Sequence, residues 1–225
     1  MTATFQPCMN VLPASQQKLW PELISVTSSG FVLYGGTAIA LRLGHRTSVD
    51  FDFFSEKPLD RKSLGSVASF LSRSTVVQDE SNTLSILIPI DDRERSHVKV
   101  SFFGAISFGR VGEPEFTDDG VLQVAASSDL LATKLKVILQ RAEAKDYRDI
   151  AALIRAGVDI PAGLAAARLL FGQTFQPSEC LKAMTYFADG DLATLANFEK
   201  AGLIDSVRAV RELPSVAIRS LQLSA

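Results

Sequence analysis

The feature that most constrains the fold is a glycine pair between a short apolar run and a helix-like segment, followed closely by two aspartates. Residues 31–54 read FVLYGGTAIALRLGHRTSVDFDFF. FVLYG is short, apolar and typical of a strand, whereas TAIALRLG has helical composition and ends at a glycine. VDFDFF is again typical of a strand. The segment therefore predicts a strand, a glycine turn, a helix and a second strand in close succession.

The glycine pair is a candidate phosphate site. Gly35 and Gly36 let a ligand approach the backbone, and a helix that starts there presents free N–H groups and the positive end of its dipole. A tight turn without any ligand is the commoner reason for a lone glycine pair. The glycines alone therefore do not establish the site.

The aspartates strengthen the hypothesis. Residues two apart in a strand share a face, so Asp50 and Asp52 should project together while Val49, Phe51 and Phe53 point into the core. Two adjacent carboxylates repel each other unless a cation neutralises them, and such oxygen ligands suit Mg²⁺ or Mn²⁺. A solvated strand face would explain an isolated pair, but the glycines upstream favour a metal-bound phosphate.

The remaining chain predicts an α/β (α+β) protein with two domains. A mixed sheet of about five strands with helices is expected in residues 1–125, and a helical domain in residues 126–225, where Ala/Leu-rich segments with helical periodicity replace the strands. Helices are expected at 13–29 and 61–73, and further strands at 74–80, 83–90 and 97–104.

Composition excludes several classes of protein. The net charge of −2 argues against a broad basic surface for nucleic acid, although a local basic groove is compatible with it. Cys8, Cys180, His45 and His97 match no zinc-site spacing, and the unpaired cysteines predict a reducing, cytoplasmic compartment. No apolar run approaches the roughly 20 residues that span a bilayer, so we expect neither export nor membrane insertion.

Residues 35–54 closely resemble the signature of the AbiEii/AbiGii-type abortive-infection toxins, the type IV toxin–antitoxin branch of the DNA polymerase beta-like nucleotidyltransferases. Residues 129–153, DLLATKLKVILQRAEAKDYRDIAAL, are similar to a second motif of that branch. The resemblance covers about residues 30–155. It implies attack by an acceptor hydroxyl on the α-phosphorus of a Mg²⁺-bound NTP with release of pyrophosphate. In such toxins the acceptor is a tRNA 3′ end or a protein, and a separately encoded antitoxin restrains the activity.

The resemblance implies roles at matching positions. The triphosphate would be held by Gly35, Gly36 and Thr37, and Mg²⁺ by Asp50 and Asp52. Lys134 would neutralise phosphate charge. Arg46, in the turn between the predicted helix and the aspartate strand, is a further candidate for phosphate, as is Arg42, although an exposed arginine at a helix end is commoner. We expect His45 to close the turn.

The spacing of the second motif adds a hypothesis of its own. On one unbroken helix, Lys134, Arg141 and Lys145 would form a single basic stripe for the nucleotide. A solvated cationic face stabilised by Asp146 or Asp149 is the alternative. A turn near Ala144 would remove the argument for a stripe.

One position departs from the superfamily pattern, which often has a third carboxylate on a later strand. In residues 97–104 the matching position is Ser101, on the same face as Lys99, and it cannot supply a negative charge. The base could then be Asp146 or a carboxylate in PIDDRE (89–94), the strand alignment could be wrong, or transfer activity could be lost. The second hypothesis is accordingly a catalytically weak NTP-binding regulatory module, and the third a structural domain that binds no NTP.

Overall fold

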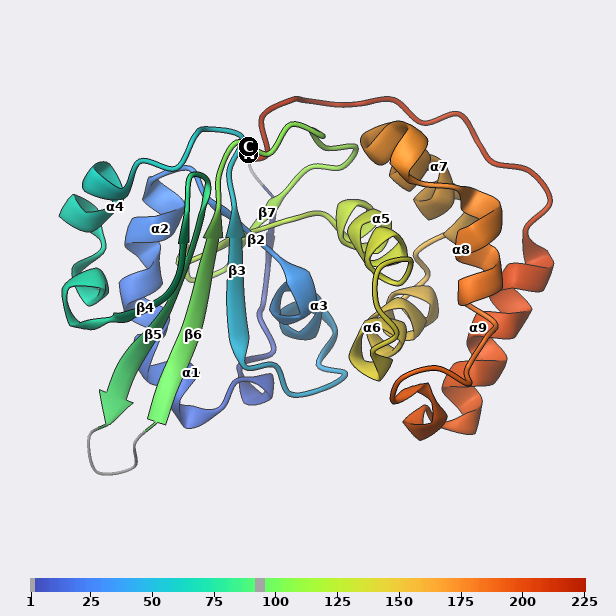
Figure 1. The fold of residues 1–225 in the computed structure, drawn as a ribbon, viewed down its shortest axis with the longest axis horizontal. Coiled ribbons are helices and arrows are strands. Elements are labelled where there is room, and N and C mark those ends of the chain that lie inside the picture. Colours follow the sequence, from blue (N-terminus) through green and yellow to red (C-terminus); the bar gives the residue numbers. More distant parts are fainter. Residues whose placement is uncertain (1–2, 92–95) are drawn as a thin grey trace. The chain divides into compact units, whose positions relative to one another are not determined.

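The computed structural model describes residues 3–91 and 96–225, except for the side chain of Asp91. It divides into two compact units (Figure 1). The first comprises Met1–Gly109, Glu113–Ala125 and Leu221–Ala225, and the second comprises Arg110–Gly112 and Ala126–Ser220. The two domains expected from the sequence, residues 1–125 and 126–225, stay a prediction, because the division into compact units does not test whether each part is a separate domain.

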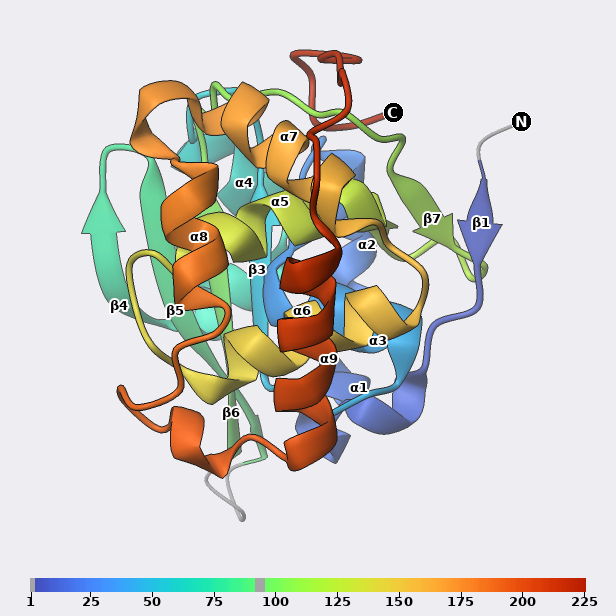
Figure 2. The ribbon, with the colours of Figure 1, turned by 90° about the vertical axis from the view of Figure 1, so that its right-hand side faces the viewer.

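The first unit is built on an eight-stranded mixed sheet in the order β1-β7-β8-β2-β3-β6-β5-β4. Strand β3 pairs antiparallel with β2 and parallel with β6. Figure 2 shows β1 and β4 at opposite edges. The strands are β1 (Thr4–Phe5), β2 (Val32–Tyr34), β3 (Asp50–Phe54), β4 (Thr75–Glu80), β5 (Thr83–Asp91), β6 (Ser96–Phe103), β7 (Glu115–Thr117) and β8 (Gln123–Val124).

The prediction of an α/β fold is confirmed, but the sheet has more strands than the five expected. The strands that were not predicted are β1, β7 and β8, each only two or three residues long. Such strands are too short to show an alternating pattern in the sequence. Pairing with their neighbours, and not local propensity, therefore defines them.

The helices of the first unit are shorter than predicted. The expected helix 13–29 is α1 (Ala14–Leu19), the 3-10 turn η2 (Trp20–Leu23) and α2 (Ile24–Ser28), and Pro21, which has no backbone N–H, lies in that turn. The expected helix 61–73 is α4 (Arg61–Val67) and the 3-10 turn η3 (Ser69–Arg73), separated at Ala68. A further 3-10 turn, η1, spans Met9–Val11.

Helix α3 (Gly35–Leu43) has the predicted form and ends at Gly44 in the left-handed conformation, φ +65°. Figure 1 shows α2 and α4 on one side of the sheet and α3 on the other.

Strand β3 separates a core face from a polar face. Phe51 and Phe53 are fully buried, whereas Asp50 and Asp52 are only partly buried on the other face. The prediction for Val49 is wrong: the residue is 52% exposed, and the strand begins one residue later, at Asp50. The register predicted for the two aspartates is otherwise as expected.

The second unit is helical from Ser127 onward. Its helices are α5 (Ser127–Val137), α6 (Ala144–Arg155), α7 (Ile160–Phe171), α8 (Pro177–Ala183) and α9 (Asn197–Ala209), with 3-10 turns η4 (Gly172–Thr174) and η5 (Leu192–Thr194). A Cβ at Gly163 would lie 2.4 Å from Leu131 Cδ2, so the close approach of α7 to α5 requires glycine. Within the described residues no helix is long and apolar enough to cross a membrane.

The C-terminal segment departs from the expected helical pattern. After α9, residues 210–220 are not helical, and Leu221–Ala225 belong to the first unit. Leu223 is fully buried there, and its backbone N–H donates a hydrogen bond to Glu56 Oε2 at 3.1 Å. The stretch 221–225, LQLSA, is too short for its apolar residues to reveal this contact in the sequence.

Candidate active site

The glycine turn and the aspartate strand meet at Gly35 and Asp52. Gly35 opens α3 with φ +75°, and a Cβ at this position would lie 2.7 Å from Asp52 Oδ2. The pairing of β2 with β3, which sets Tyr34 opposite Asp52, produces this approach. The first N–H groups of a helix have no partner within the helix and carry the positive end of its dipole. A carboxylate and a helix N-terminus therefore lie side by side in this unit.

Asp50 and Asp52 share one face of β3, as predicted, and together they suit a divalent metal. Both side chains are partly buried, whereas Phe51 and Phe53, which lie next to them in the strand, point to the other face. Among the described residues no group of three or more Asp, Glu, His or Cys side chains is placed to hold a metal ion. Mg²⁺ commonly binds proteins through one or two carboxylates and takes its other oxygens from water and substrate phosphate. The two aspartates fit that mode of binding.

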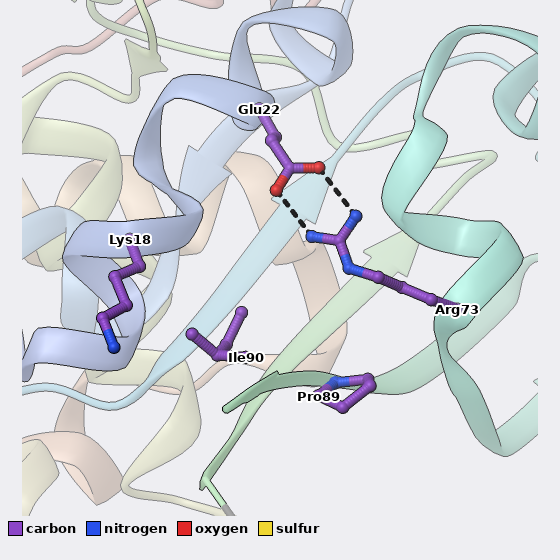
Figure 3. Close-up of a pocket in the computed structure, with 5 residues that line it drawn as sticks. All are labelled: Lys18, Glu22, Arg73, Pro89 and Ile90. Atoms are coloured by element: carbon purple, nitrogen blue, oxygen red, sulfur yellow. Dashed lines mark hydrogen bonds and ion pairs between the residues drawn. The ribbon is translucent and has the colours of Figure 1, made fainter. Parts of the chain in front are cut away.

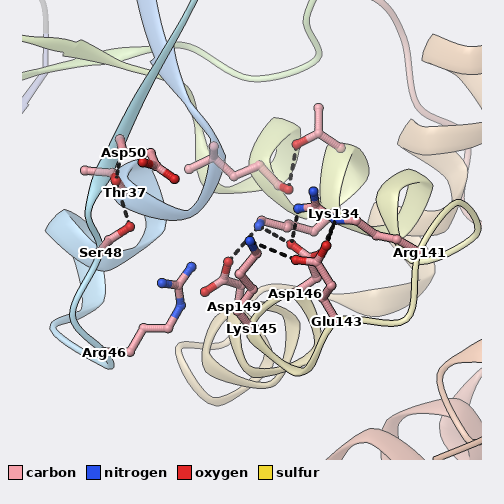
Figure 4. Close-up of polar contacts among 12 residues, drawn as sticks. Thr37, Arg46, Ser48, Asp50, Lys134, Arg141, Glu143, Lys145, Asp146 and Asp149 are labelled. Carbon is pink, nitrogen blue, oxygen red and sulfur yellow. Dashed lines mark hydrogen bonds and ion pairs between the residues drawn. The ribbon is translucent and has the colours of Figure 1, made fainter. Parts of the chain in front are cut away.

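Thr37 uses its hydroxyl within the protein. Its side chain is buried, and Oγ1 donates a hydrogen bond to the backbone carbonyl of Asp50 (Figure 4). Ser48 Oγ lies 2.7 Å from Thr37 Oγ1 and donates to it, since the one hydroxyl proton of Thr37 is already engaged. Any contact of Thr37 with a phosphate would thus go through its backbone N–H in the first turn of α3.

The chain that leads into β3 is held at three points. Besides Thr37, the side-chain amide of Gln16 donates a hydrogen bond of 2.6 Å to the carbonyl of Val49, and Ser48 N donates to Val11 O at 3.1 Å. Gln16 is buried in α1. Sequence reasoning missed Gln16 because a single glutamine in a helix gives no sign of a partner 33 residues away.

The two arginines near the glycine helix differ in their surroundings. Arg42 pairs with Glu115 and donates to the carbonyls of Val124 and Ala125, and its guanidinium stacks on the ring of Phe5. It therefore ties α3 to the sheet. Arg46 is partly exposed and donates to the carbonyl of Thr47 at 3.0 Å. Figure 4 shows Arg46 in the turn that precedes Asp50.

Ser101 occupies the position at which the superfamily pattern predicts a third carboxylate. It lies in register with Asp52 on the neighbouring strand β6, and Lys99 lies in register with Asp50. Ser101 and Lys99 therefore share one face of β6, as predicted from the sequence, and this face continues that of the two aspartates. Ser101 is 2% exposed and carries no charge. Its hydroxyl oxygen accepts a hydrogen bond of 3.1 Å from Ser85 Oγ across the β5–β6 pair.

In the second unit, Lys134 forms a buried ion cluster with two aspartates (Figure 4). Its ammonium lies 2.6 Å from Asp146 Oδ1 and 2.7 Å from Asp149 Oδ2, and all three side chains are almost entirely buried. Arg141 Nε donates to Asp146 Oδ2 at 2.8 Å from a more exposed position. Sequence reasoning treated Asp149 only as a surface partner, although its three-residue spacing from Asp146 places both on one helix face.

The prediction of a single basic stripe is wrong. Helix α5 ends at Val137 and α6 begins at Ala144, so Lys134, Arg141 and Lys145 do not share a helix. Lys134 and Arg141 converge nevertheless, on the carboxylate of Asp146. Lys145 instead pairs with Glu143 at 2.8 Å and is half exposed.

Asp146 is ionised in this environment. Burial raises the pKa of its carboxyl, but the hydrogen bond from Arg141 and the charge of Lys134 outweigh burial and hold the pKa below its ordinary value. A carboxylate that two cations bind is a weak proton acceptor. The other proposed source of a base, the PIDDRE stretch, has its acidic side chains outside the described residues.

A separate hollow of about 510 Å³ lies elsewhere in the first unit (Figure 3). Its lining consists of Lys18, Glu22, Arg73, Pro89 and Ile90. Arg73 donates two hydrogen bonds to the carboxylate of Glu22, at 3.0 and 2.5 Å. None of the candidate residues for nucleotide or metal is in this lining.

Comparison with known proteins identifies the family. The family described as "Nucleotidyl transferase AbiEii toxin, Type IV TA system" matches residues 23–211. An uncharacterized protein of Aquifex aeolicus (strain VF5) is 33% identical over 150 residues, which cover 65% of this chain and 69% of that protein.

Among solved structures, MenT4, a nucleotidyltransferase toxin of Mycobacterium tuberculosis H37Rv, is similar with a TM-score of 0.59 and 16% identity. The match covers 87% of this chain and 82% of MenT4. At this identity the likeness shows a common fold. The family match over most of the chain confirms the resemblance found in the two sequence motifs: this chain belongs to the AbiEii nucleotidyl transferase toxin family of type IV toxin–antitoxin systems.

Proposed function

We propose that the protein transfers a nucleoside monophosphate from an NTP to an acceptor hydroxyl and releases pyrophosphate. The observation that carries this proposal is the approach of Asp52 to Gly35, which joins a carboxylate pair to the N-terminus of α3. An anion at the helix terminus and a cation at the carboxylates are complementary charges, and an NTP with its metal supplies both.

Each group of residues has a distinct task in this reaction. Gly35, Gly36 and the backbone of Thr37 bind the phosphates, and Asp50 and Asp52 hold Mg²⁺ or Mn²⁺. When bound, the metal neutralises charge on the triphosphate and on the departing pyrophosphate. The acceptor hydroxyl gives up its proton to solvent, its oxygen forms a bond to the α-phosphorus, and the bond from that phosphorus to the pyrophosphate oxygen breaks.

Thr37 and Gln16 position the strand that carries the carboxylates. Their hydrogen bonds to the carbonyls of Asp50 and Val49 fix the backbone at the start of β3. Ligand side chains held by such outer contacts keep their geometry during binding. Arg46, in the turn that precedes Asp50 (Figure 4), is the candidate for an additional phosphate contact.

In the second unit, the family resemblance implies that Lys134 neutralises the charge of the phosphates. Its contacts with Asp146 and Asp149 support a fixed orientation for the ammonium group. The lowered pKa of Asp146 favours a role in holding Lys134 and Arg141 over a role as base. Arg141 and Lys145, both about half exposed, remain candidates for nucleotide contact.

The acceptor is a tRNA 3′ end or a protein, and an antitoxin is the proposed partner that restrains the activity. Membership of a toxin–antitoxin family supports the antitoxin. The net charge of −2 favours a protein acceptor unless a local basic surface binds RNA.

A second function is favoured by Ser101. With a buried serine in register with Asp52, the chain could bind NTP and metal as a regulatory module without transferring a nucleotide. This alternative predicts Mg²⁺-dependent NTP binding and no labelled product.

Incubation with each α-³²P-labelled NTP, Mg²⁺ and cellular RNA and protein tests the proposal. Label on RNA or protein that disappears in Asp52→Asn supports transfer and identifies the acceptor class. NTP binding without label in any fraction would support the regulatory alternative. Arg61→Gln, which changes a partly exposed residue of the same unit that pairs with Asp79, is a matched control expected to label normally.

A further inference from the structure

Aromatic side chains continue the polar face of β3 beyond the two aspartates. Residues two apart in a strand lie about 7 Å apart on one face, so Asp50, Asp52 and Phe54 form a row. Phe54 lies at the centre of four rings, which we call the aromatic cluster: Tyr34, Phe54, Phe103 and Phe108.

The rings of the aromatic cluster contact one another closely. Phe54 stacks on Tyr34 with 4.8 Å between ring centroids and an interplanar angle of 12°. Phe103 meets Phe54 edge-on at 5.1 Å, and Phe108 lies 6.5 Å from Phe54 and 6.4 Å from Tyr34. The register of β3 with β2 and β6 produces these contacts, because it places Phe103 opposite Phe54 and Tyr34 opposite Asp52.

Three rings of the aromatic cluster differ from the rings that form the core, whereas the fourth, Tyr34, is 1% exposed and belongs to the core. Phe51, Phe53 and Phe102 are fully buried, and Phe51 and Phe53 lie on the opposite face of β3. Phe54, Phe103 and Phe108 are only partly buried. Aromatic rings that keep accessible surface beside a candidate phosphate and metal site are suited to a planar ligand.

We propose that the aromatic cluster is the stacking platform for the nucleobase of the NTP. This inference rests on the proposed function, which places the phosphates at Gly35 and the metal at Asp52. From there the nucleotide reaches Phe54 one step farther along the same strand face, and the ribose spans that step. Base stacking on aromatic side chains is a common and sequence-tolerant mode of nucleotide binding.

The chemistry of the platform predicts its selectivity. The three partly buried rings, Phe54, Phe103 and Phe108, carry no hydrogen-bonding group and so recognise the face of a base and not its edge. Every base has such a face. Binding through the platform should therefore favour a nucleotide over a bare triphosphate and discriminate only weakly among the four bases.

Two ligands that differ only in the nucleoside test this inference. The dissociation constants of ATP and of inorganic tripolyphosphate, each with Mg²⁺, are measured for the wild-type chain and for Phe54→Leu and Phe108→Leu. Leucine keeps an apolar side chain but removes the ring. Phe108→Trp keeps an aromatic ring at that position. Phe116→Leu is the matched control, because Phe116 is a partly buried phenylalanine on β7, elsewhere in the sheet.

The expected result is weaker ATP binding in both leucine variants, by about 5- to 100-fold, with tripolyphosphate binding unchanged. Phe108→Trp and Phe116→Leu should bind both ligands as the wild type does. If the leucine variants bind both ligands equally more weakly, or bind ATP as tightly as the wild type, the proposal of a stacking platform is wrong. A wild-type chain that binds neither ligand overturns the proposed function itself. Thermal unfolding of each variant confirms that the sheet is intact.

Discussion

Gly35 and Asp52 are in such close approach that a Cβ on Gly35 would lie 2.7 Å from Asp52 Oδ2. Gly35 also has φ +75°, which L side chains rarely adopt. Gly35→Ala should therefore displace the Asp52 carboxylate and abolish nucleotidyl transfer. The strain should also lower the free energy of unfolding by about 1–3 kcal/mol. Transfer assays and urea unfolding measure the two effects.

Gly65→Ala is the matched control, because Gly65 lies in α4 and a Cβ there would meet nothing within 4 Å. It should leave transfer unchanged and stabilise the fold by up to about 1 kcal/mol. If Gly35→Ala were as active as the wild type, the carboxylate would not need its observed position.

The two faces of β3 should respond oppositely to substitution. Asp50→Asn and Asp52→Asn should abolish metal-dependent turnover while changing stability little, because neither side chain is in the core. Phe51→Ala should cost about 3–5 kcal/mol of unfolding free energy, since Phe51 is fully buried. Thermal unfolding with parallel transfer assays separates the two effects. Full turnover in both asparagine variants would exclude the proposed metal site.

The Ser85–Ser101 pair allows a test of whether Ser101 has any part in the chemistry. Ser101→Ala leaves the buried Ser85 hydroxyl without this partner and should cost about 1–3 kcal/mol. The double variant Ser85→Ala with Ser101→Ala should recover most of that loss, because no buried hydroxyl is left over. Urea unfolding of both variants measures this. Transfer should persist in the double variant; its loss in a stable protein would show that one of these two serines takes part in the reaction.

The local pattern of the sequence was sufficient to predict the glycine turn, α3 and the aspartate face of β3. The alternation of apolar and polar residues in a strand and the glycine at the end of a helix are local signals, so they do not depend on distant parts of the chain. The same alternation placed Ser101 and Lys99 on one face of their strand, and the structure sets these two residues in register with Asp52 and Asp50.

Features that depend on partners distant in the chain were not predictable. The hydrogen bond from Gln16 to Val49 and the burial of Leu223 join segments far apart in sequence. The basic stripe failed for a different reason: helical periodicity continued through residues where the chain makes a turn. Lys134 and Arg141 still converge, but a shared carboxylate brings them together and not a shared helix.

The buried position of Lys134 predicts a large contribution to stability. Lys134→Met would leave the carboxylates of Asp146 and Asp149 without their common cation, and removing one partner from a buried ion cluster costs about 3–5 kcal/mol. Lys145→Met removes a half-exposed cation paired with Glu143 and should cost at most about 1 kcal/mol. Urea unfolding of the two variants compares these costs. Equal costs would mean that Lys134 is not tied to both aspartates in solution.

The ion cluster also predicts how stability depends on pH. The pKa of Asp146 lies below its ordinary value in the folded chain, because Arg141 and Lys134 outweigh the effect of burial. The unfolded chain, with a carboxyl pKa of about 3.9, therefore takes up the proton first as the pH falls. The stability contributed by Asp146 is fully present above that value and is lost as the pH drops through the lower, folded pKa.

Asp146→Asn should accordingly be less stable than the wild type by a constant amount from pH 7 to about pH 5, and the difference should shrink below about pH 4. Urea unfolding across this range measures the difference. Asp205→Asn is the control, since Asp205 is 74% exposed and pairs with Arg208 at 3.7 Å, and it should differ from the wild type by less than about 1 kcal/mol throughout. A difference that grew in acid would instead mean that the folded chain raises the pKa of Asp146, which would restore Asp146 as a candidate for the base.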